Sequence, residues 1–165
     1  MNQNNKITQD VLNNFLLNSL SPTNYVKFEM EAKPENEKLA RNLVASFLLE
    51  LNPSIEELND IKTAISEAVT NAIVHGYNKK KGVIAITGKI YENFIYLEVK
   101  DFGVGINDIK KAMQPFYTSK PEEERSGMGF TVMETFMDAI KVFNNVDANG
   151  LTVAMVKEIK SKESD

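Results

Sequence analysis

Residues 26–33 alternate between apolar and charged side chains, and this two-residue period is typical of a strand with one buried face. Two further runs rich in β-branched and aromatic residues, 83–90 and 94–101, are separated by a short Tyr-Glu-Asn segment and predict a hairpin. A second strand pair is predicted over 140–144 and 151–159, joined by a turn-rich segment. The alternation therefore predicts a sheet built from these strands.

Apolar residues recur at helical spacing between the predicted strands. The first such stripe covers 36–51 and is closed by Asn52–Pro53. Ser54 and Glu57 have the spacing of a capping box, so a second helix should start there and run to His75–Gly76, where a left-handed glycine would close it. Shorter helices are predicted at 107–113 and 127–138. This order of elements predicts an α+β, two-layer sandwich in which helices cover one face of a mixed sheet.

The two ends of the chain differ from the segment between them. Residues 1–24 are rich in asparagine and serine, with apolar residues at near-helical spacing, and predict an amphipathic helical extension whose role the sequence leaves open. Residues 25–159 have the length and apolar content of one globular domain, in a chain of 165 residues that is 42% hydrophobic. Residues 160–165 form a charged tail.

Charge and composition narrow the classes of partner. A net charge of -4 and an isoelectric point near 5.2 argue against a broad nucleic-acid surface, which needs clustered Lys and Arg. No apolar run approaches the roughly 20 residues that cross a bilayer, and the N-terminus lacks the pattern of an export signal. The chain has no cysteine, so disulfides and thiolate metal sites are excluded. We therefore expect a cytoplasmic protein without a membrane segment, whose partner is a small molecule or another protein.

Glu67 and Asn71 form the first candidate constellation. Side chains four residues apart lie on the same helix face, and here that face borders the apolar stripe of the second predicted helix. A carboxylate at the rim of a pocket could take a proton from an attacking hydroxyl, and an amide oxygen could ligate magnesium. Taken alone, the same pattern is more typical of a solvated helix surface.

The segment from Asp101 to Gly105 stands where a predicted strand ends. A carboxylate in that place can accept a hydrogen bond from an exocyclic amine, and Gly103 and Gly105 allow backbone to come close to a flat purine ring. An ordinary glycine turn explains the segment equally well when it is considered alone. The Asp-Phe-Gly triplet is not the magnesium motif of eukaryotic-type protein kinases, because no His-Arg-Asp catalytic loop precedes it.

Arg125-Ser-Gly-Met-Gly-Phe130 stands at the start of a predicted helix, after the polar segment 114–126. Free N–H groups and the positive end of a helix dipole attract phosphate, and glycine permits a close approach. Arg125 and Lys120 could neutralise a terminal phosphate. A single Gly-x-Gly is weak evidence, so the joint order of the three constellations carries the interpretation.

In that order the chain resembles the ATPase family shared by gyrase, Hsp90, sensor histidine kinases and MutL. Its N box is matched by Glu67 to Asn71, its G1 box by Asp101 to Gly105 and its G2 box by Gly127 to Gly129. Within this family, the runs 66–77 and 114–130 closely resemble those of the anti-sigma F factors of spore-forming bacteria. The resemblance covers about residues 25–158 and implies the Bergerat type of ATP-binding sandwich.

The resemblance implies roles for individual residues. Glu67 would be the general base, Asn71 the magnesium ligand and Asp101 the adenine reader. Thr152 would make a second contact at the adenine, and Thr118 would belong to the lid over the nucleotide. The residues implied to hold the phosphates are Lys120, Arg125, Ser126, Gly127, Met128, Gly129 and Phe130. Leu151 departs from the pattern, because a small hydroxyl residue is more usual there.

The resemblance also implies partners. A homodimer with bound ATP and Mg²⁺ would sequester the sporulation sigma factor, and the kinase would phosphorylate a serine of an anti-anti-sigma factor; Arg41 matches the arginine used for both proteins. Two alternatives stay open. One is a sequestering module without catalysis, and the other is a detached catalytic domain of a histidine kinase. Against the second, His75 is the only histidine, and it lies inside the N box.

Overall fold

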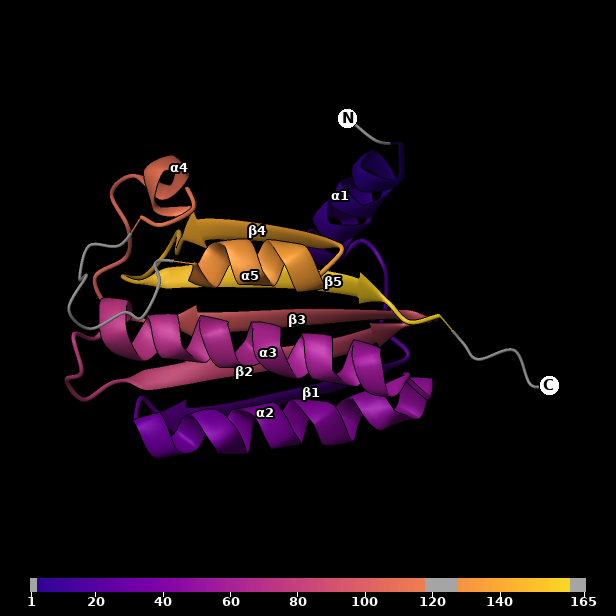
Figure 1. Ribbon diagram of the computed structural model, residues 1–165, viewed down its shortest axis with the longest axis horizontal. Helices are drawn as coiled ribbons and strands as arrows, with labels where there is room; N and C mark the ends of the chain where they lie inside the picture. The colour runs from indigo at the N-terminus through magenta and orange to yellow at the C-terminus, as the bar shows by residue number, and fades with distance from the viewer. Residues whose placement is uncertain (1–2, 118–127, 161–165) are drawn as a thin grey trace.

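The computed structural model describes residues 3–117 and 128–160, and for residues 3–8 it describes the backbone alone. Five strands form one sheet in the order β1-β2-β3-β5-β4 (Figure 1). Their bounds are Asn24–Glu31 for β1, Val83–Tyr91 for β2, Phe94–Asp101 for β3, Ala139–Asn144 for β4 and Leu151–Glu158 for β5. These agree with the strands predicted from the alternation to within one or two residues at each end.

The expected α+β sandwich is confirmed, but the sheet is antiparallel between all neighbouring strands rather than mixed. β3 and β4 are linked through a helix, a connection that makes two strands run in the same direction. β5 lies between them and runs antiparallel to both. β3 and β4 therefore run in the same direction, but they are not hydrogen-bonded neighbours.

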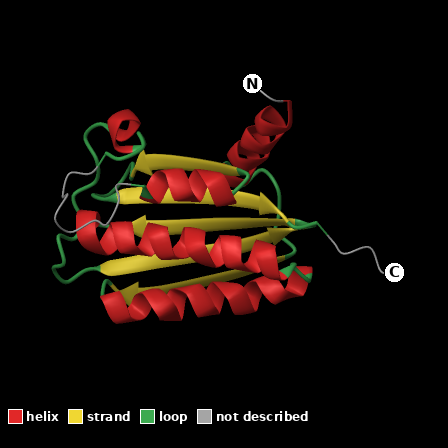
Figure 2. Ribbon diagram, viewed as in Figure 1, coloured by secondary structure: helices red, strands yellow, loops and turns green. Residues whose placement is uncertain are grey.

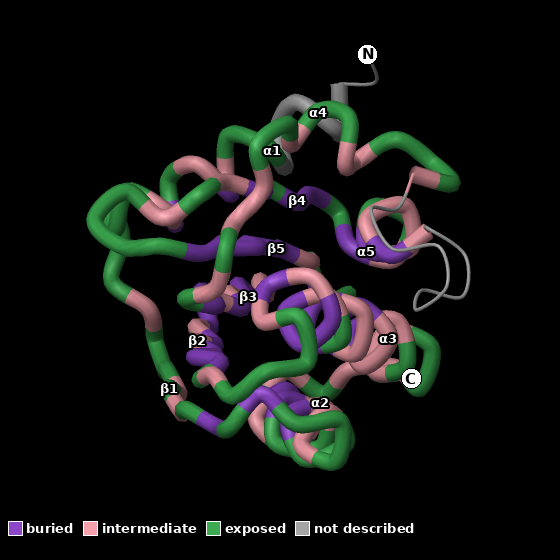
Figure 3. Tube along the Cα trace, turned by 90° about the vertical axis from the view of Figure 1, so that its left-hand side faces the viewer, coloured by how far each residue is buried: buried purple, intermediate pink, exposed green. Residues whose placement is uncertain are grey.

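Three helices cover one face of the sheet (Figures 2 and 3): α2 over Pro34–Leu48, α3 over Ile55–Asn71 and α5 over Gly129–Phe136. Short elements accompany them, namely the 3₁₀ turn η1 over Leu49–Leu51, the π-helical turn η2 over Ala72–Gly76 and the helix α4 over Ile109–Ala112. The main core lies between these helices and the sheet, with alternate strand residues such as Leu97 and Val99 facing it. No helix in the described ranges is both long and apolar enough to span a membrane.

The long helix α3 begins as predicted and ends differently. Ser54 Oγ accepts from the Glu57 N–H at 3.1 Å and Glu57 Oε2 accepts from the Ser54 N–H at 2.8 Å, so the capping box is complete. The last turn widens into the π-helical η2, a distortion that often marks a functional site. Gly76 is not left-handed, contrary to our expectation. A glycine is required because a Cβ at this position would lie 2.9 Å from the Asp101 carboxylate.

The N-terminal helix α1, Gln3–Leu16, packs on the opposite face of the sheet. Leu12 is fully buried, and the ring of Phe15 stacks on that of Tyr91 with centroids 3.9 Å apart and planes 6° from parallel. A second, smaller core forms there with β4 and β5. The predicted helical extension is thus a helix with its own apolar docking surface, and helices do not cover only one face.

Replacing Phe15 by leucine is expected to lower the free energy of unfolding by about 1–2 kcal/mol, because ring stacking and some buried area are lost. Leu17→Ala is the matched control, since Leu17 is 76% exposed and its change should stay within about 0.5 kcal/mol. Urea denaturation of the two variants measures both values. Equal midpoints for both variants and the parent chain would show that α1 is not docked in solution.

Candidate functional site

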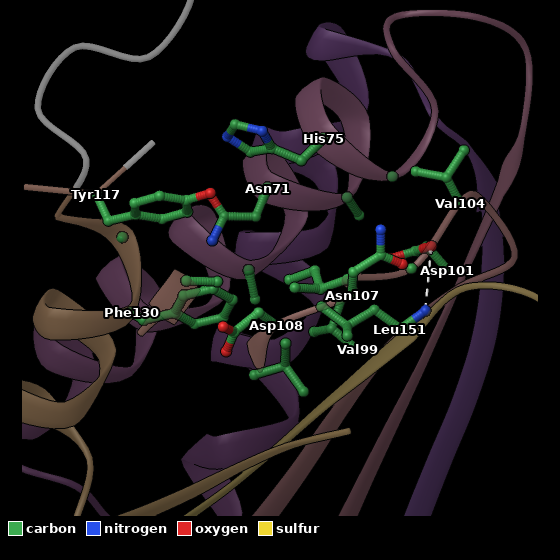
Figure 4. Close-up of a pocket in the computed structure, with 18 of the residues that line it drawn as sticks. Asn71, His75, Val99, Asp101, Val104, Asn107, Asp108, Tyr117, Phe130 and Leu151 are labelled. Atoms are coloured by element: carbon green, nitrogen blue, oxygen red, sulfur yellow. Dashed lines mark hydrogen bonds between the residues drawn. The ribbon is translucent and has the colours of Figure 1, made fainter. Parts of the chain in front are cut away.

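A cavity of about 440 Å³ opens between the end of α3, the loop after β3 and the start of α5 (Figure 4). This volume lies in the range of about 300–1,000 Å³ that is usual for small-molecule sites. In the view of Figure 4, Asn71, Tyr117 and Phe130 lie toward one end of the cavity, and Asp101 and Leu151 lie toward the other. Described residues from each of the three constellations, among them Asn71, Asp101 and Phe130, therefore meet at one place.

Asp101 is the buried acid of the cavity, with 4% of its surface exposed. Its Oδ1 accepts from the N–H groups of Gly103 at 2.9 Å and Leu151 at 3.3 Å. Burial raises the pKa of Asp101, and these two backbone hydrogen bonds offset part of the rise. Within the described residues both bonds go to Oδ1, so Oδ2 keeps its capacity to accept a hydrogen from a bound molecule.

Glycine is present at positions 103 and 105, after Asp101, for two different structural reasons. A Cβ on Gly103 would lie 1.9 Å from the carbonyl oxygen of Gly76, so only glycine lets the loop pack against η2. Gly105 has a φ of +70°, in the left-handed region that favours glycine, and it lines the cavity. The Val104 N–H donates to the Gly76 carbonyl at 3.0 Å and ties the loop to η2. Gly103 thus permits contact with protein backbone, and Gly105 is the one that faces the cavity.

Glu67 and Asn71 meet the first turn of α5. A Cβ built on Gly129 would lie 3.0 Å from Asn71 Nδ2 and 3.3 Å from Glu67 Oε2. Both polar side chains are half-buried, as expected for the rim of a pocket, and Asn71 lines the cavity. Gly129 therefore allows α5 to approach this pair closely, and the start of α5 forms one polar corner with Glu67 and Asn71.

Phe130 lines the cavity beside Gly129, and Met128 stands at the N-cap position of α5 without a side-chain cap bond. The first N–H groups of this helix therefore have no side-chain acceptor of their own at the cap, which suits an anion. The predicted contacts Thr118, Lys120, Arg125, Ser126 and Gly127 lie outside the described residues.

Thr152 is not brought to the cavity. Its hydroxyl donates to Asn145 Oδ1 at 2.6 Å, and it is Leu151 and Val153 that line the pocket. Successive residues of a strand face opposite sides of a sheet, so Leu151 and Thr152 cannot both reach the cavity. The geometry does not support the expected contact between Thr152 and an adenine.

Several lining residues were not singled out from the sequence. Asn107 and Asp108 immediately precede α4, Lys111 lies within it, and Tyr117 follows it. Asp108 Oδ1 accepts from the Lys111 N–H at 3.0 Å, and Lys111 Nζ lies 5.3 Å from the centre of the Tyr117 ring. The signal that could have found them is Asp108, a helix-capping residue in a loop that closely follows the Asp101 turn.

Arg41 lies on α2 and does not line the cavity. Its side chain is 35% exposed, and Nε lies 3.8 Å from Glu37 Oε1. Glu37 also accepts a hydrogen bond from the Ser66 hydroxyl on α3. The predicted partner-binding residue is therefore partly held by its own helix rather than fully solvated.

Comparison with known proteins agrees with this geometry. Residues 30–157 match the family model described as a histidine kinase-like ATPase domain. An anti-sigma F factor of Clostridium novyi (strain NT) is 50% identical over 141 residues, which cover 85% of this chain and 98% of that protein.

Two solved structures share the fold. The RsbU and RsbW domains of Rv1364c from Mycobacterium tuberculosis superpose with a TM-score of 0.59 at 19% identity, covering 84% of this chain and 32% of that one. Full-length ShkA in complex with AMPPNP superposes with a TM-score of 0.53 at 12% identity, covering 97% of this chain and 37% of that one. The chain belongs to the anti-sigma F factor family and carries a histidine kinase-like ATPase domain.

Proposed function

We propose that this protein binds Mg-ATP in the cavity, transfers the γ-phosphoryl group to a serine of an anti-anti-sigma factor, and holds a sporulation sigma factor inactive. One observation carries the proposal. Glu67 and Asn71 meet Gly129 at one corner of a cavity that contains the buried carboxylate of Asp101. This arrangement supports a role for Glu67, at the rim of the cavity, in proton transfer and a role for Asp101, inside it, in base recognition.

Asp101 supports adenine binding at its end of the cavity. The ionised carboxylate offers Oδ2 as an acceptor for the exocyclic amine of adenine. Val99, Leu151 and Val153 supply apolar surface suited to a flat ring. A guanine would present a carbonyl where adenine has its amine, and two acceptors would then face each other. Asp101 therefore favours ATP over GTP.

Asn71 and the start of α5 support phosphate binding at the other end. Within residues 3–117 and 128–160, no three His, Cys, Asp or Glu side chains are grouped closely enough to hold a metal ion by themselves. The Asn71 amide oxygen fits magnesium, which keeps phosphate and water oxygens as most of its ligands. When bound, the ion would neutralise phosphate charge. Lys120 and Arg125 are proposed to add positive charge, Ser126 and Gly127 to help hold the phosphates, and Thr118 to belong to the lid.

Glu67 is the proposed general base. Its carboxylate lies beside Asn71 and the start of α5, where it can orient the serine hydroxyl of the substrate. It would accept the hydroxyl proton as the serine oxygen bonds to the γ-phosphorus and the bond from that phosphorus to the leaving ADP breaks. The remaining acceleration comes from positioning the two substrates and from neutralising charge. The chain is accordingly proposed to be a protein serine/threonine kinase.

Sigma-factor binding is proposed from the family. The anti-sigma F factor of Clostridium novyi is named for that activity, and half of its aligned residues are identical here. We propose a cytoplasmic homodimer in which Arg41 contacts both protein partners. The two partners would then compete for one surface, so occupancy by one shifts the equilibrium away from the other.

The direct test incubates the chain with radiolabelled ATP, magnesium and a cognate anti-anti-sigma protein. We expect label on a serine of that substrate, stable to acid and absent when its serine is replaced by alanine. Binding of ATP and sigma factor without phosphoserine would leave only the sequestering module. Acid-labile phosphate on His75 would instead support the histidine kinase reading.

A further inference from the structure

We propose that Asn145 is a positioning residue that holds Asp101 in place for adenine, so that the turn between β4 and β5 sets the preference for ATP. This inference rests on the proposed nucleotide site. It assigns to Asn145 and Thr152 a role at that site without direct contact, since neither residue lines the cavity.

Both the nitrogen and the oxygen of the Asn145 side-chain amide make hydrogen bonds. Its Nδ2 donates to the main-chain oxygen of Asp101 at 2.8 Å and to that of Asn149 at 2.8 Å. Its Oδ1 accepts from the Thr152 hydroxyl at 2.6 Å. The reversed amide would place an oxygen against two carbonyl oxygens, so the environment fixes the orientation. A half-buried amide with every partner supplied is a rigid anchor.

The same turn holds both the backbone and the side chain of Asp101. Asn145 binds its carbonyl oxygen, and the Leu151 N–H binds its carboxylate at 3.3 Å. Gly150 lets the turn pack closely against the end of β3, because a Cβ on Gly150 would lie 2.1 Å from the main-chain oxygen of Asp101. A small shift of the turn would therefore move the carboxylate that faces the cavity.

A neighbouring residue holds the far end of the loop. Asn144 Nδ2 donates to the Ile106 carbonyl at 2.7 Å, and its Oδ1 accepts from the Ile106 N–H at 2.9 Å. The loop from Asp101 to Ile106 is thus fixed at both ends by two consecutive asparagines, Asn144 at the end of β4 and Asn145 at the start of the turn. Asn144 acts on the part of the loop away from the carboxylate, so the preference for adenine is assigned to Asn145.

A purely structural role and a positioning role differ in what they do to different nucleotides. Loss of a turn-closing hydrogen bond would lower stability and weaken every nucleotide alike. Loss of a positioning contact should weaken only the nucleotide whose exocyclic amine needs the Asp101 carboxylate. ATP and purine riboside triphosphate, which lacks that amine, are therefore the discriminating pair of probes.

The experiment titrates both nucleotides, with magnesium, into the full chain and its variants by calorimetry. Asn145→Ala is expected to weaken ATP binding about 10-fold and to leave the purine riboside nucleotide unchanged, as for a lost hydrogen bond to a charged acceptor. Thr152→Val, which keeps the side-chain shape, should weaken ATP about 3-fold in the same selective way. Asp147→Ala is the control on the same turn, because Asp147 is exposed.

The double variant Asn145→Ala/Thr152→Val should match Asn145→Ala alone, because Thr152 acts through Asn145. Equal loss of both nucleotides, or unchanged ATP binding in a folded Asn145→Ala chain, would overturn the positioning role. If Asn145→Ala does not fold, selective loss in Thr152→Val supports the inference and unchanged selectivity overturns it. Failure of the parent chain to bind either nucleotide would instead overturn the proposed function.

Discussion

Replacing Glu67 with glutamine is expected to lower the rate of phosphoryl transfer by about 10²–10⁴-fold, the usual contribution of a general base. Glutamine keeps the size of the side chain beside Gly129 and Asn71 but cannot accept a proton at neutral pH. The affinity for Mg-ATP should change little, because Asp101, Asn71 and the backbone N–H groups at the start of α5 are unchanged. Single-turnover phosphorylation and calorimetry on the same samples separate these two effects.

Glu56→Gln is the matched control, since Glu56 lies exposed in the first turn of the same helix. That variant should transfer phosphate at the parent rate. A Glu67→Gln chain that keeps more than about a tenth of the parent rate would exclude Glu67 as the general base, given the size of such effects.

Replacing Asp101 with asparagine is expected to weaken ATP binding about 10- to 100-fold, the range for losing a hydrogen bond to a charged group. Asparagine has nearly the same shape, so the contacts from Gly103 and Leu151 can persist through its oxygen. Its amide nitrogen replaces one acceptor with a donor, which would face the adenine amine. The variant should therefore lose its preference for ATP over GTP, as measured by competition binding.

The pH dependence of ATP affinity gives a second test of the role of the Asp101 carboxylate. Burial raises the pKa of Asp101, and only the ionised form accepts the adenine amine. ATP affinity should have its full value above this raised pKa and should fall as pH is lowered through it. The fall should begin at a higher pH than it would for an exposed aspartate. The Asp101→Asn chain should lack this step, whereas Asp147→Asn should retain it. An identical acid profile in all three chains would show that Asp101 does not read the base.

Local rules predicted the framework well because they depend on neighbours in the chain. The capping box at Ser54 and the closure at Asn52, which has a φ of 49°, follow from backbone chemistry within four residues. The strand boundaries followed from alternation, because each strand has at least one face in the core. Glu67 and Asn71 shared a helix face and were brought together as predicted.

The expectations that failed depend on contacts between distant segments. Gly76 is a glycine because of Asp101, and no local pattern shows that close approach. β5 lies between β3 and β4 in the sheet, and the order of elements along the chain does not determine which strands pair. Thr152 is different, since the alternation along β5 already places Leu151 and Val153 on the helix-covered face and could have excluded it.

The role of the β4–β5 turn also lay beyond the sequence. Asn145 looked like a turn-forming residue, and its contact with Asp101 joins positions 44 residues apart. The docking of α1 could not be predicted for the same reason. Its apolar stripe indicated a helix but did not show which face of the sheet the helix would pack on. Sequence patterns of this kind predict that a surface is buried, and the fold determines its partner.

Calorimetric titration of Mg-ATP into the unmodified chain measures directly whether this cavity is an ATP site. We expect saturable binding at one site per chain, with GTP competing only at much higher concentration and with ATP affinity selectively reduced by Asp101→Asn. Absence of any heat of binding, or equal binding of ATP and GTP that Asp101→Asn leaves unchanged, would contradict the assignment of this cavity to ATP.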